Sequence, residues 1–367
     1  MDYKNPKLII ESSQLTPGKV RWRSPSNIAL IKYWGKYGEQ LPRNPSISLT
    51  LSQAATDTTL SYSAKQSEKE IDLDFYFAGE SRPDFALRVE KYLKSLLPVF
   101  PFLGQLHLRI DTNNSFPHSA GIASSASAMS AIALVLCSIE QRFFETLSNA
   151  EVFYQKASYL ARLGSGSACR SVYPHVAVWG EVGEIPRASN LYAIPYADQV
   201  HDIFQTYHDD ILIISKSEKS VSSGAGHNLM EGNLYADNRY LQARQRMDKL
   251  TAAMRAGDLE TFGKITEAEA LTLHALMMTS NPPYLLMEPN SIAAIRKVQA
   301  YRTETGHPLY FTLDAGPNLH LLYPDNIANE VKTFIRSELT PLCQDGIYIA
   351  DRCGAGPEEL EADLSLS

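Results

Sequence analysis

The chain has 367 residues, of which 44% are hydrophobic and 20% are charged, and its formal net charge is −7. A single hydrophobic core stops growing near about 250–300 residues, so this length predicts two domains. The mildly acidic balance argues against a nucleic-acid partner, which normally requires a basic domain. Any anionic ligand must therefore be met by local cations.

The cysteine pattern predicts a reducing compartment, and the hydropathy predicts no membrane span. The four cysteines are scattered without C-x-x-C pairs: Cys137, Cys169, Cys343 and Cys353. That spacing predicts free thiols and a cytoplasmic protein rather than a disulfide scaffold. The N-terminus carries no signal-peptide pattern, and no segment has about 18 consecutive apolar residues, so we expect no membrane contact. The nine histidines show no zinc-ligand spacing.

The first third of the chain predicts strands. Apolar and polar residues alternate in "SISLTLS" from Ser46, in "IDLDFYF" from Ile71 and in "QLHLRI" from Gln105, which is the pattern of half-buried strands. Apolar residues at helical spacing predict a helix over 85–96, and Pro98 ends that run.

The middle of the chain predicts two helices and then a strand. A loop rich in Ser and Gly passes into the Ala-rich segment "SASAMSAIALVLCSIE", a second helix covers Ala150–Leu163, and "VAVWGEV" reads as a strand. The pattern weakens between Glu184 and His208. We therefore place one domain at 1–195 and a second at 196–367.

The second domain predicts mixed elements as well. "DDILIIS" is a strand, an apolar face repeats over 240–254, and "AGD" separates that helix from another that starts at Leu259. Three further strands are expected in "HPLYFTLDAGPN", "LHLLYP" and "GIYIAD". Because strands and helices do not alternate regularly, the fold class is α+β rather than a doubly wound sheet.

Five loops carry chemistry, and each also has a structural interpretation. "PHSAGIASSAS" (Pro117–Ser127) leads into a helix N-terminus, which attracts phosphate, but a serine-capped helix would look the same. "SPSNIALIKYWGKYGEQLPRNPS" gathers Lys32, Tyr33, Lys36 and Arg43, which could hold an anion or form a solvated loop.

Taken alone, each of the other three loops also allows a functional and a structural interpretation. "SKSEKSVSSGAGH" supplies lysines, serines and glycines, and "TLDAGPN" puts Asp314 at a strand end, where it could serve as a base or cap the turn. "GSGSACRS" places Arg170 behind small residues, and Arg162, one helix turn before that stretch, is expected at the surface. Together the loops could form a phosphate-binding pocket with one base.

In this order, the motifs resemble the GHMP kinase superfamily, and within it the diphosphomevalonate decarboxylase family. The resemblance covers about Ser24–Pro357 and is carried by "SPSNIALIKYWGK", "AGIASSAS", "GSGSACRS", "KSVSS", "LHALMMTSNPPY", "YFTLDAGPN" and "CGAGP". "AGIASSAS" marks only the superfamily, whereas "KYWGK" with "GSGSACRS" and "DAGPN" marks the decarboxylase branch. It implies an N-terminal domain like ribosomal protein S5 domain 2, a ferredoxin-like C-terminal domain, an active site in the cleft between them, MgATP as cosubstrate and a homodimer.

The resemblance also implies residue roles. Asp314 would face the C3 hydroxyl, Arg170 would bind the substrate carboxylate, Ser125 would lie nearest the transferred phosphoryl group and Asn27 would support the reacting end. The substrate diphosphate would meet Tyr33, Trp34, Gly35, Lys36 and Ser223. The mevalonyl part would be lined by Ser165, Gly166, Ser167, Ala168, Cys169 and Arg170. ATP phosphates would be cradled by Gly121, Ile122, Ala123, Ser124, Ser125, Ala126 and Ser127, and Mg²⁺ would arrive with ATP, near Ser125.

The implied reaction is ATP-dependent decarboxylation of (R)-5-diphosphomevalonate to isopentenyl diphosphate. Three departures from the family are present: Pro174-His175 replace a Gly-Gly pair, Gly224 replaces Thr or Arg, and His227 replaces Met. These departures leave open a phosphomevalonate decarboxylase or a mevalonate 3-kinase, and a non-enzymatic ligand-binding paralogue as a third alternative. The retained Asp314, Arg170 and Ser125 favour an enzyme.

Overall fold

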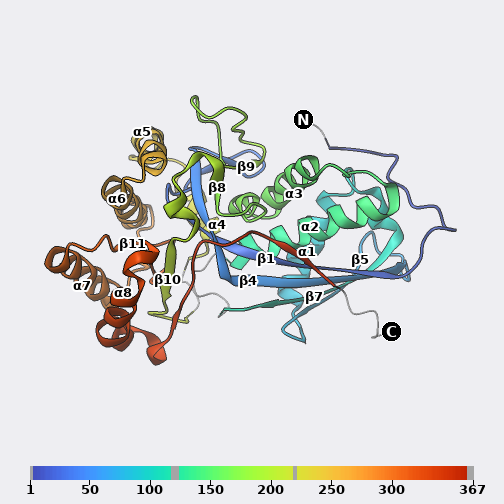
Figure 1. The fold of residues 1–367 in the computed structure, drawn as a ribbon. Helices are drawn as coiled ribbons and strands as arrows, with labels where there is room; N and C mark the ends of the chain where they lie inside the picture. Colours follow the sequence, from blue (N-terminus) through green and yellow to red (C-terminus); the bar gives the residue numbers. More distant parts are fainter. Residues whose placement is uncertain (1–2, 117–123, 218–220, 362–367) are drawn as a thin grey trace.

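The computed structural model describes residues 3–116, 124–217 and 221–361, which form two packed units of helix and sheet (Figure 1). The first unit is built on an eight-stranded, mainly antiparallel sheet of order β14-β1-β4-β7-β5-β6, with β8 paired to β4 and β9 to β8. Its strands are β1 (Gly18–Ala29), β4 (Ser46–Ala64), β5 (Asp72–Phe77), β6 (Glu80–Ser81), β7 (Leu106–Asn114), β8 (Val176–Trp179), β9 (Ala193–Pro195) and β14 (Glu358–Leu360). A two-stranded ribbon, β2 (Lys36–Tyr37) with β3 (Leu41–Pro42), follows β1.

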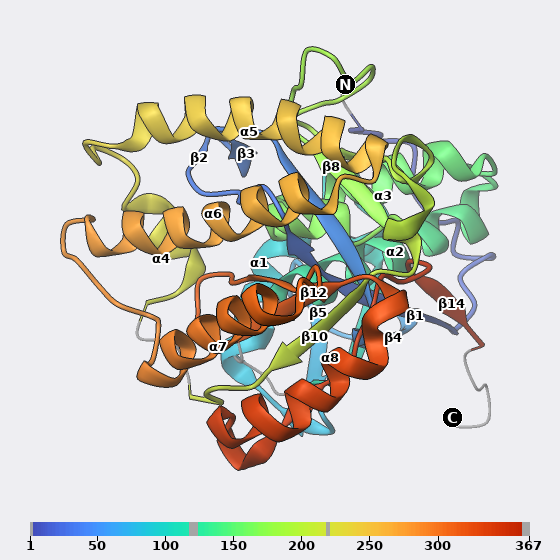
Figure 2. The ribbon, with the colours of Figure 1, turned by 60° about the vertical axis from the view of Figure 1, so that its left-hand side comes forward.

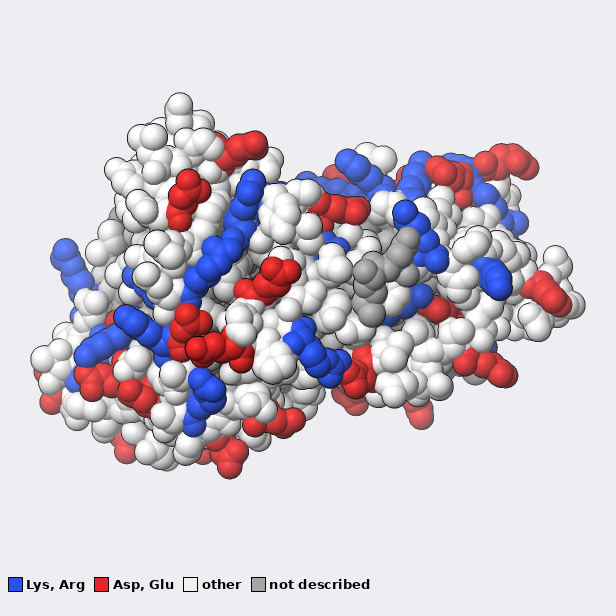
Figure 3. Space-filling model, turned by 90° about the horizontal axis from the view of Figure 1, so that it is seen from above, with Lys and Arg blue, Asp and Glu red and all other residues white. Residues whose placement is uncertain are grey.

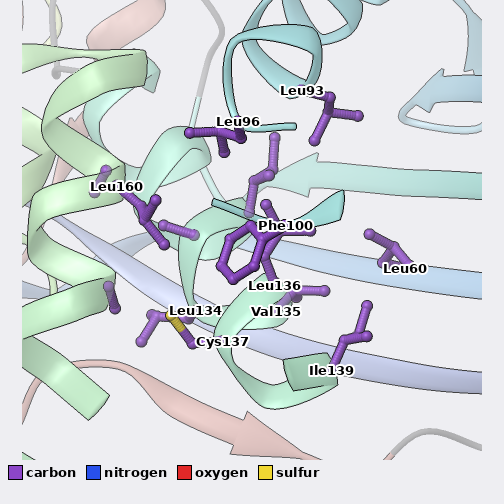
Figure 4. Close-up of a cluster of buried hydrophobic side chains, with 14 of the residues drawn as sticks. Leu60, Leu93, Leu96, Phe100, Leu134, Val135, Leu136, Cys137, Ile139 and Leu160 are labelled. Carbon is purple, nitrogen blue, oxygen red and sulfur yellow. The ribbon is translucent and has the colours of Figure 1, made fainter. Parts of the chain in front are cut away.

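Three helices cover one face of this sheet: α1 (Pro83–Ser95), α2 (Ser124–Phe144) and α3 (Ala150–Gly164). Figure 4 shows Leu93, Leu136 and Leu160, one from each helix, gathered near Phe100, and all four are fully buried. By length and composition α2 could cross a membrane, but 67% of its apolar window is buried inside the protein. Its composition is therefore explained by its place in the core.

The second unit is a four-stranded antiparallel sheet of order β11-β12-β10-β13 with helices on both faces. Its strands are β10 (His208–Leu212), β11 (Tyr310–Thr312), β12 (Leu319–Tyr323) and β13 (Tyr348–Ile349). Its helices are α4 (Ser223–Asn228), α5 (Ala236–Ala256), α6 (Leu259–Met278), α7 (Pro289–Thr305) and α8 (Ala328–Phe334). Ile211 packs in one cluster with residues of α5 and α6, whereas Leu212 packs in another with α7 and α8. Figure 2 shows α5 and α6 lying side by side.

The C-terminal segment returns to the first sheet (Figure 1). Cys353 forms a bridge with Leu51, Gly354 N–H donates to Thr50 O at 2.8 Å, and β14 pairs with β1. The last strand of the predicted second domain therefore lies on the sheet of the first. His175 N–H donates to Gly354 O at 2.9 Å, so the Pro174-His175 departure contacts this returning segment. His175 holds a φ of 54°, a region where glycine is favoured.

The α+β class and the sequence-predicted strands and helices are confirmed. The "AGD" break is also confirmed: Gly257 takes a left-handed φ of 70° after α5, and Asp258 caps α6 by accepting from Thr261 N–H. The structure differs at Ser24–Ala29, where we expected part of a loop. These residues form the second half of β1 and are buried on both faces, so they lack the period-two alternation that identifies a half-buried strand.

Candidate active site

The predicted loops meet around the end of β1, and each contacts another. Ser125 Oγ lies 3.3 Å from Ser165 Oγ. A Cβ built on Gly166 would lie 2.8 Å from the Tyr33 hydroxyl oxygen. Gly35 N–H donates to His227 Nδ1 at 3.0 Å. Lys32 then reaches Asp314, so residues from five separate stretches of the chain form one continuous set of contacts.

Lys32 and Asp314 form an ion pair at the centre of this set. Lys32 Nζ lies 2.8 Å from Asp314 Oδ1, and the two side chains are 2% and 26% exposed. The solvated-loop interpretation of this stretch is wrong for Lys32, because a lysine so deeply buried requires an anionic partner. Our sequence-based site omitted Lys32. The available signal was its position directly after the apolar run "IALI", which predicts burial.

The main-chain carbonyl of Asp314 is held by two contacts. Gly316 N–H donates to the Asp314 carbonyl at 2.7 Å, and His274 Nε2 lies 3.1 Å from the same oxygen. The turn after β11 is thus held through backbone groups and through α6. The carboxylate is directed toward Lys32 by a backbone that is already positioned.

Arg170 is buried with part of its guanidinium committed to the protein. Its Nε and Nη2 donate to Asn27 Oδ1, both at 3.2 Å, and Nε also approaches Ser48 Oγ at 3.1 Å. Asn27 is itself fixed, since its Nδ2 donates to Ser171 Oγ at 2.8 Å and to Ser167 O at 3.2 Å. Arg170 Nη1 is buried without a partner among the described residues. That atom is available to an acidic ligand.

Electrostatics tie Arg170 to the ion pair. Burial lowers the pKa of Arg170, and the Asp314 carboxylate is among the groups that oppose this shift. An arginine remains charged under these conditions. The site therefore holds two buried cations, Lys32 and Arg170, and one partly exposed carboxylate.

The segment Tyr33–Lys36 is wrapped by residues of both units. The Tyr33 ring lies 4.7 Å from Trp179 and 4.2 Å from His227, measured between ring centroids. Burial raises the pKa of Tyr33, whose hydroxyl has no partner among the described residues. Lys36 is half-buried, and its Nζ donates to Gln40 Oε1 at 3.3 Å.

His227 is the histidine that replaces the methionine of the family pattern. Its ring lies 4.7 Å from Trp34, and Nδ1 accepts from Gly35 N–H. Burial, and then the charge of Lys36, lowers the pKa of His227 to about 3. The imidazole is consequently neutral at physiological pH, with its proton on Nε2.

The small residues of "GSGSACRS" have different surroundings. Gly166 accommodates Tyr33 and Trp179, whose ring a Cβ would approach to 3.0 Å. Ser165 and Ser167 are half-buried, whereas Ala168 and Cys169 are fully buried in the core. The surface expectation for Arg162 is wrong: it is 2% exposed and donates to the carbonyls of Leu191 and Glu39.

Only part of the predicted ATP-binding stretch lies within the described residues. Gly121, Ile122 and Ala123 lie outside the described residues. The helix α2 begins at Ser124, and Ser125 is exposed at its first turn. Ala126 and Ser127 are buried, with Ser127 Oγ 2.6 Å from Thr56 Oγ1.

Ser223 is the remaining predicted site residue. It is the exposed first residue of α4, next to the capping residue Ser222. Within the part of the chain that the structure describes, no group of three or more His, Cys, Asp or Glu side chains could hold a metal ion.

Comparisons with known proteins agree over nearly the whole chain. The family described as "Diphosphomevalonate decarboxylase-like N-terminal domain" matches residues 24–189, and "Mevalonate 5-diphosphate decarboxylase C-terminal domain" matches residues 210–359. The diphosphomevalonate decarboxylase of Schizosaccharomyces pombe is 32% identical, over 94% of each chain. That of Candida albicans is 29% identical, over 93% of this chain and 98% of the relative.

Solved structures give the same answer. Mevalonate diphosphate decarboxylase from Staphylococcus aureus superposes with a TM-score of 0.79 at 26% identity, over 94% of this chain and 99% of that one. A structure described as "MDDEF in complex with MVAPP, AMPPCP and Magnesium" gives 0.79 at 28% identity, over 95% and 100%. On the sequence, the fold and the shared motifs, the chain belongs to the diphosphomevalonate decarboxylase family.

Proposed function

We propose that this chain decarboxylates (R)-5-diphosphomevalonate in an ATP-dependent reaction that yields isopentenyl diphosphate, ADP, phosphate and CO₂. The observation that carries the proposal is the pairing of Asp314 with buried Lys32, close to a buried Arg170 whose Nη1 has no partner among the described residues. One carboxylate and one arginine fork supply the two functions that the reaction needs. They are activation of a tertiary hydroxyl and alignment of a carboxylate.

Asp314 acts on the substrate hydroxyl. A tertiary hydroxide is a poor leaving group, and transfer of the ATP γ-phosphoryl group to that oxygen converts it into phosphate. Phosphoryl transfer depends mainly on positioning and on charge neutralisation. Asp314, held by the fixed main chain after β11, orients the hydroxyl and accepts its proton, and Lys32 holds the carboxylate in place.

Arg170 acts on the substrate carboxylate. Loss of phosphate builds positive charge at C3, and the adjacent carboxylate leaves as CO₂ while its electrons form the alkene. Asn27 and Ser48 hold one side of the guanidinium, which leaves Nη1 to align the carboxylate with the breaking C–O bond. The role of Asn27 is thus to position Arg170.

The anionic groups of both substrates have matching donors. Ser124 and Ser125 lie at the start of α2, a helix of 21 residues, whose free N–H groups favour phosphate. The exposed hydroxyl of Ser125 suits a phosphate oxygen or Mg²⁺ that arrives with ATP. The substrate diphosphate is assigned to Tyr33–Lys36 with Ser223, where Lys36 supplies the charge.

A substrate panel tests the proposal. Mevalonate, its 5-phosphate and its 5-diphosphate are each incubated with MgATP, and kcat/KM is measured for ADP release and for CO₂ release. The proposal predicts the highest kcat/KM for the 5-diphosphate, with both products formed. Preference for the 5-phosphate would indicate a phosphomevalonate decarboxylase, and ADP alone from mevalonate would indicate a 3-kinase.

The family relationship also bears on the compartment and the oligomeric state of the protein. We propose a cytoplasmic homodimer, consistent with the four buried free cysteines. Light scattering after size exclusion should give about twice the chain mass of 40.8 kDa, and a monomeric mass would contradict the dimer.

A further inference from the structure

The peptide of Lys32 is held by side chains from the second unit. Lys32 follows the end of β1 and lies outside the sheet ladder. Its N–H donates to Glu269 Oε2 at 2.9 Å, and its carbonyl accepts from Arg239 Nη2 at 3.2 Å. Asn44 Nδ2 also donates to that carbonyl, at 3.0 Å. Buried backbone groups need such partners, and here two helices supply them.

Glu269, Arg239 and Arg246 form the cluster that provides these bonds. Arg239 on α5 meets Glu269 on α6 through a fork, with Nη1–Oε1 at 2.7 Å and Nη2–Oε2 at 2.6 Å. Their side chains are 1% and 0% exposed. Arg246 adds a bond from its Nη1 to Glu269 Oε1 at 2.8 Å.

The ionised form of Glu269 is stabilised by its arginine partners. Burial opposes ionisation of Glu269, but the charges and hydrogen bonds of Arg239 and Arg246 outweigh it and hold the pKa below the ordinary value. An ionised carboxylate in this place accepts four hydrogen bonds, one of them from the Lys32 N–H. Apolar residues often stabilise a fold as well as a buried ion pair does. Stability alone therefore does not account for this cluster, and a positional role is a second function that it can serve.

We infer that Glu269, Arg239 and Arg246 form a positioning unit that fixes the Lys32 backbone and thereby sets the Lys32–Asp314 pair. The inference rests on the proposed function of that pair. Lys32 has a long flexible side chain, so the position of Nζ depends on where the main chain is anchored. The unit also joins the α5–α6 pair to the reacting end of the site, although none of its three side chains touches Asp314 in the contacts described.

The test replaces Glu269 with an uncharged residue of the same shape. Glu269→Gln should lower kcat about 10- to 100-fold, because a small misplacement of a reacting group can cost that much. KM for the 5-diphosphate should change less than about threefold, since the diphosphate is met elsewhere. A purely structural role would lower the amount of folded enzyme but leave the kcat of the folded fraction unchanged.

Glu140→Gln is the matched control. Glu140 and Lys156 form another buried pair, with 2.6 Å between Oε2 and Nζ and side chains 4% and 5% exposed, but it joins α2 to α3 within the first unit. This variant should keep kcat within about twofold of the wild type. An equal fall in kcat in both variants, or a wild-type kcat in Glu269→Gln, would overturn the inference.

A double-mutant cycle and hydrogen exchange complete the test. In a Lys32→Met background the Glu269→Gln change should have little further effect on kcat, because both act through Lys32. Exchange of the Lys32 amide should accelerate at least about tenfold in Glu269→Gln and not in Glu140→Gln. Unchanged exchange or additive kcat effects would refute the positioning role.

Two outcomes need a separate measurement, namely an unfolded Glu269→Gln variant and an inactive wild type. If Glu269→Gln does not fold, Arg246→Gln, at a side chain 20% exposed, should show a smaller fall in kcat with the same unchanged KM. An unchanged kcat in that variant would count against the unit. If the wild type releases neither ADP nor CO₂, the proposed function fails, whereas the exchange measurement still tests the anchoring of Lys32.

Discussion

At the scale of single residues, the candidate site is a set of buried charges that satisfy one another. Lys32 and Arg170 are 2% and 1% exposed, and the charged groups near them are the carboxylates of Glu269 and Asp314. Removing a charged group from water is costly unless it is paired. Nη1 of Arg170 has no partner among the described residues, so we propose that a ligand supplies one.

Arg170→Lys tests the arginine fork. Lysine keeps the positive charge but cannot donate to Asn27 and Ser48 and present a further N–H at a fixed angle. We expect kcat/KM for the 5-diphosphate to fall about 100-fold or more, with most of the loss in kcat. Steady-state kinetics with the folded variant would check this, and a variant with near-normal kcat would show that charge alone is sufficient.

Lys36→Ala tests the division of labour within the "KYWGK" segment. Lys36 is assigned to a phosphate that does not react, so its loss should raise KM about tenfold and leave kcat within about threefold. Lys264, on an exposed turn of α6 in an i,i+4 pair with Glu260, gives the control variant Lys264→Ala. A fall in kcat at unchanged KM would place Lys36 at the reacting end instead.

At the scale of elements, the short helix α4 links the second unit to the "KYWGK" segment. A Cβ on Gly226 would lie 2.5 Å from the Trp34 ring, and His227 packs against Tyr33 and Trp34. Trp34 and Gly226 are nearly two hundred residues apart, and neither motif indicates that it packs against the other. The sequence alone therefore could not predict this contact.

The neutral state of His227 predicts a pH-dependent stability. Its pKa is 6.5 in the unfolded chain and about 3 when folded, so between these values the unfolded state binds a proton that the native state does not. Its contribution is fully present above pH 6.5 and is lost progressively as the pH falls toward 3. Between pH 6.5 and 5 the free energy of unfolding should fall by about 1–2 kcal/mol from this group.

His227→Gln should remove this part of the pH dependence. Denaturant unfolding at pH 7, 6 and 5 would measure the slope, with His307→Gln as control, since His307 pairs with Tyr301 away from Lys36. Equal slopes in the wild type and His227→Gln would show that His227 is protonated in the native state.

A single periodic apolar face was the clearest signal by which the sequence predicted an element. The strand β7 and the helices α1 and α5 follow this rule. The second half of β1 does not, because the sheet buries one side and the second unit buries the other. α7 escaped notice for a different reason: its mixed apolar and polar faces give little periodicity.

At the scale of the whole molecule, the two units are joined by more than the linker near 195–208. Asp351, on the segment that returns to the first sheet, accepts from Ser52, Gln53 and Ala54 N–H groups at 2.7–2.8 Å. Acidic and basic side chains are interspersed on the face shown in Figure 3. No extended basic surface stands out on this face, so we propose that the local cations of the site bind the phosphates.

The site as a whole was partly predictable from sequence. Motif resemblance brought Asp314, Arg170 and Lys36 together, because the family pattern carries their order. The loop "KYWGK" begins with Lys32, which was named as a possible anion ligand, but the assigned site residues left Lys32 out. Its anchor Glu269 was missed, because their pairing depends on the packing of α5 and α6 against β1. Arg162 was also misassigned, because its carbonyl partners come from segments distant in the chain.

The coupled release of ADP and CO₂, measured in one reaction of the wild type and of Asp314→Asn with the 5-diphosphate, tests the proposed chemistry most directly. We predict one CO₂ for each ADP in the wild type. Asp314→Asn should lose both products by at least about 1,000-fold while it still binds the 5-diphosphate in calorimetry. Release of ADP without CO₂ from the wild type, or wild-type turnover by Asp314→Asn, would contradict the proposed role of Asp314 in ATP-dependent decarboxylation.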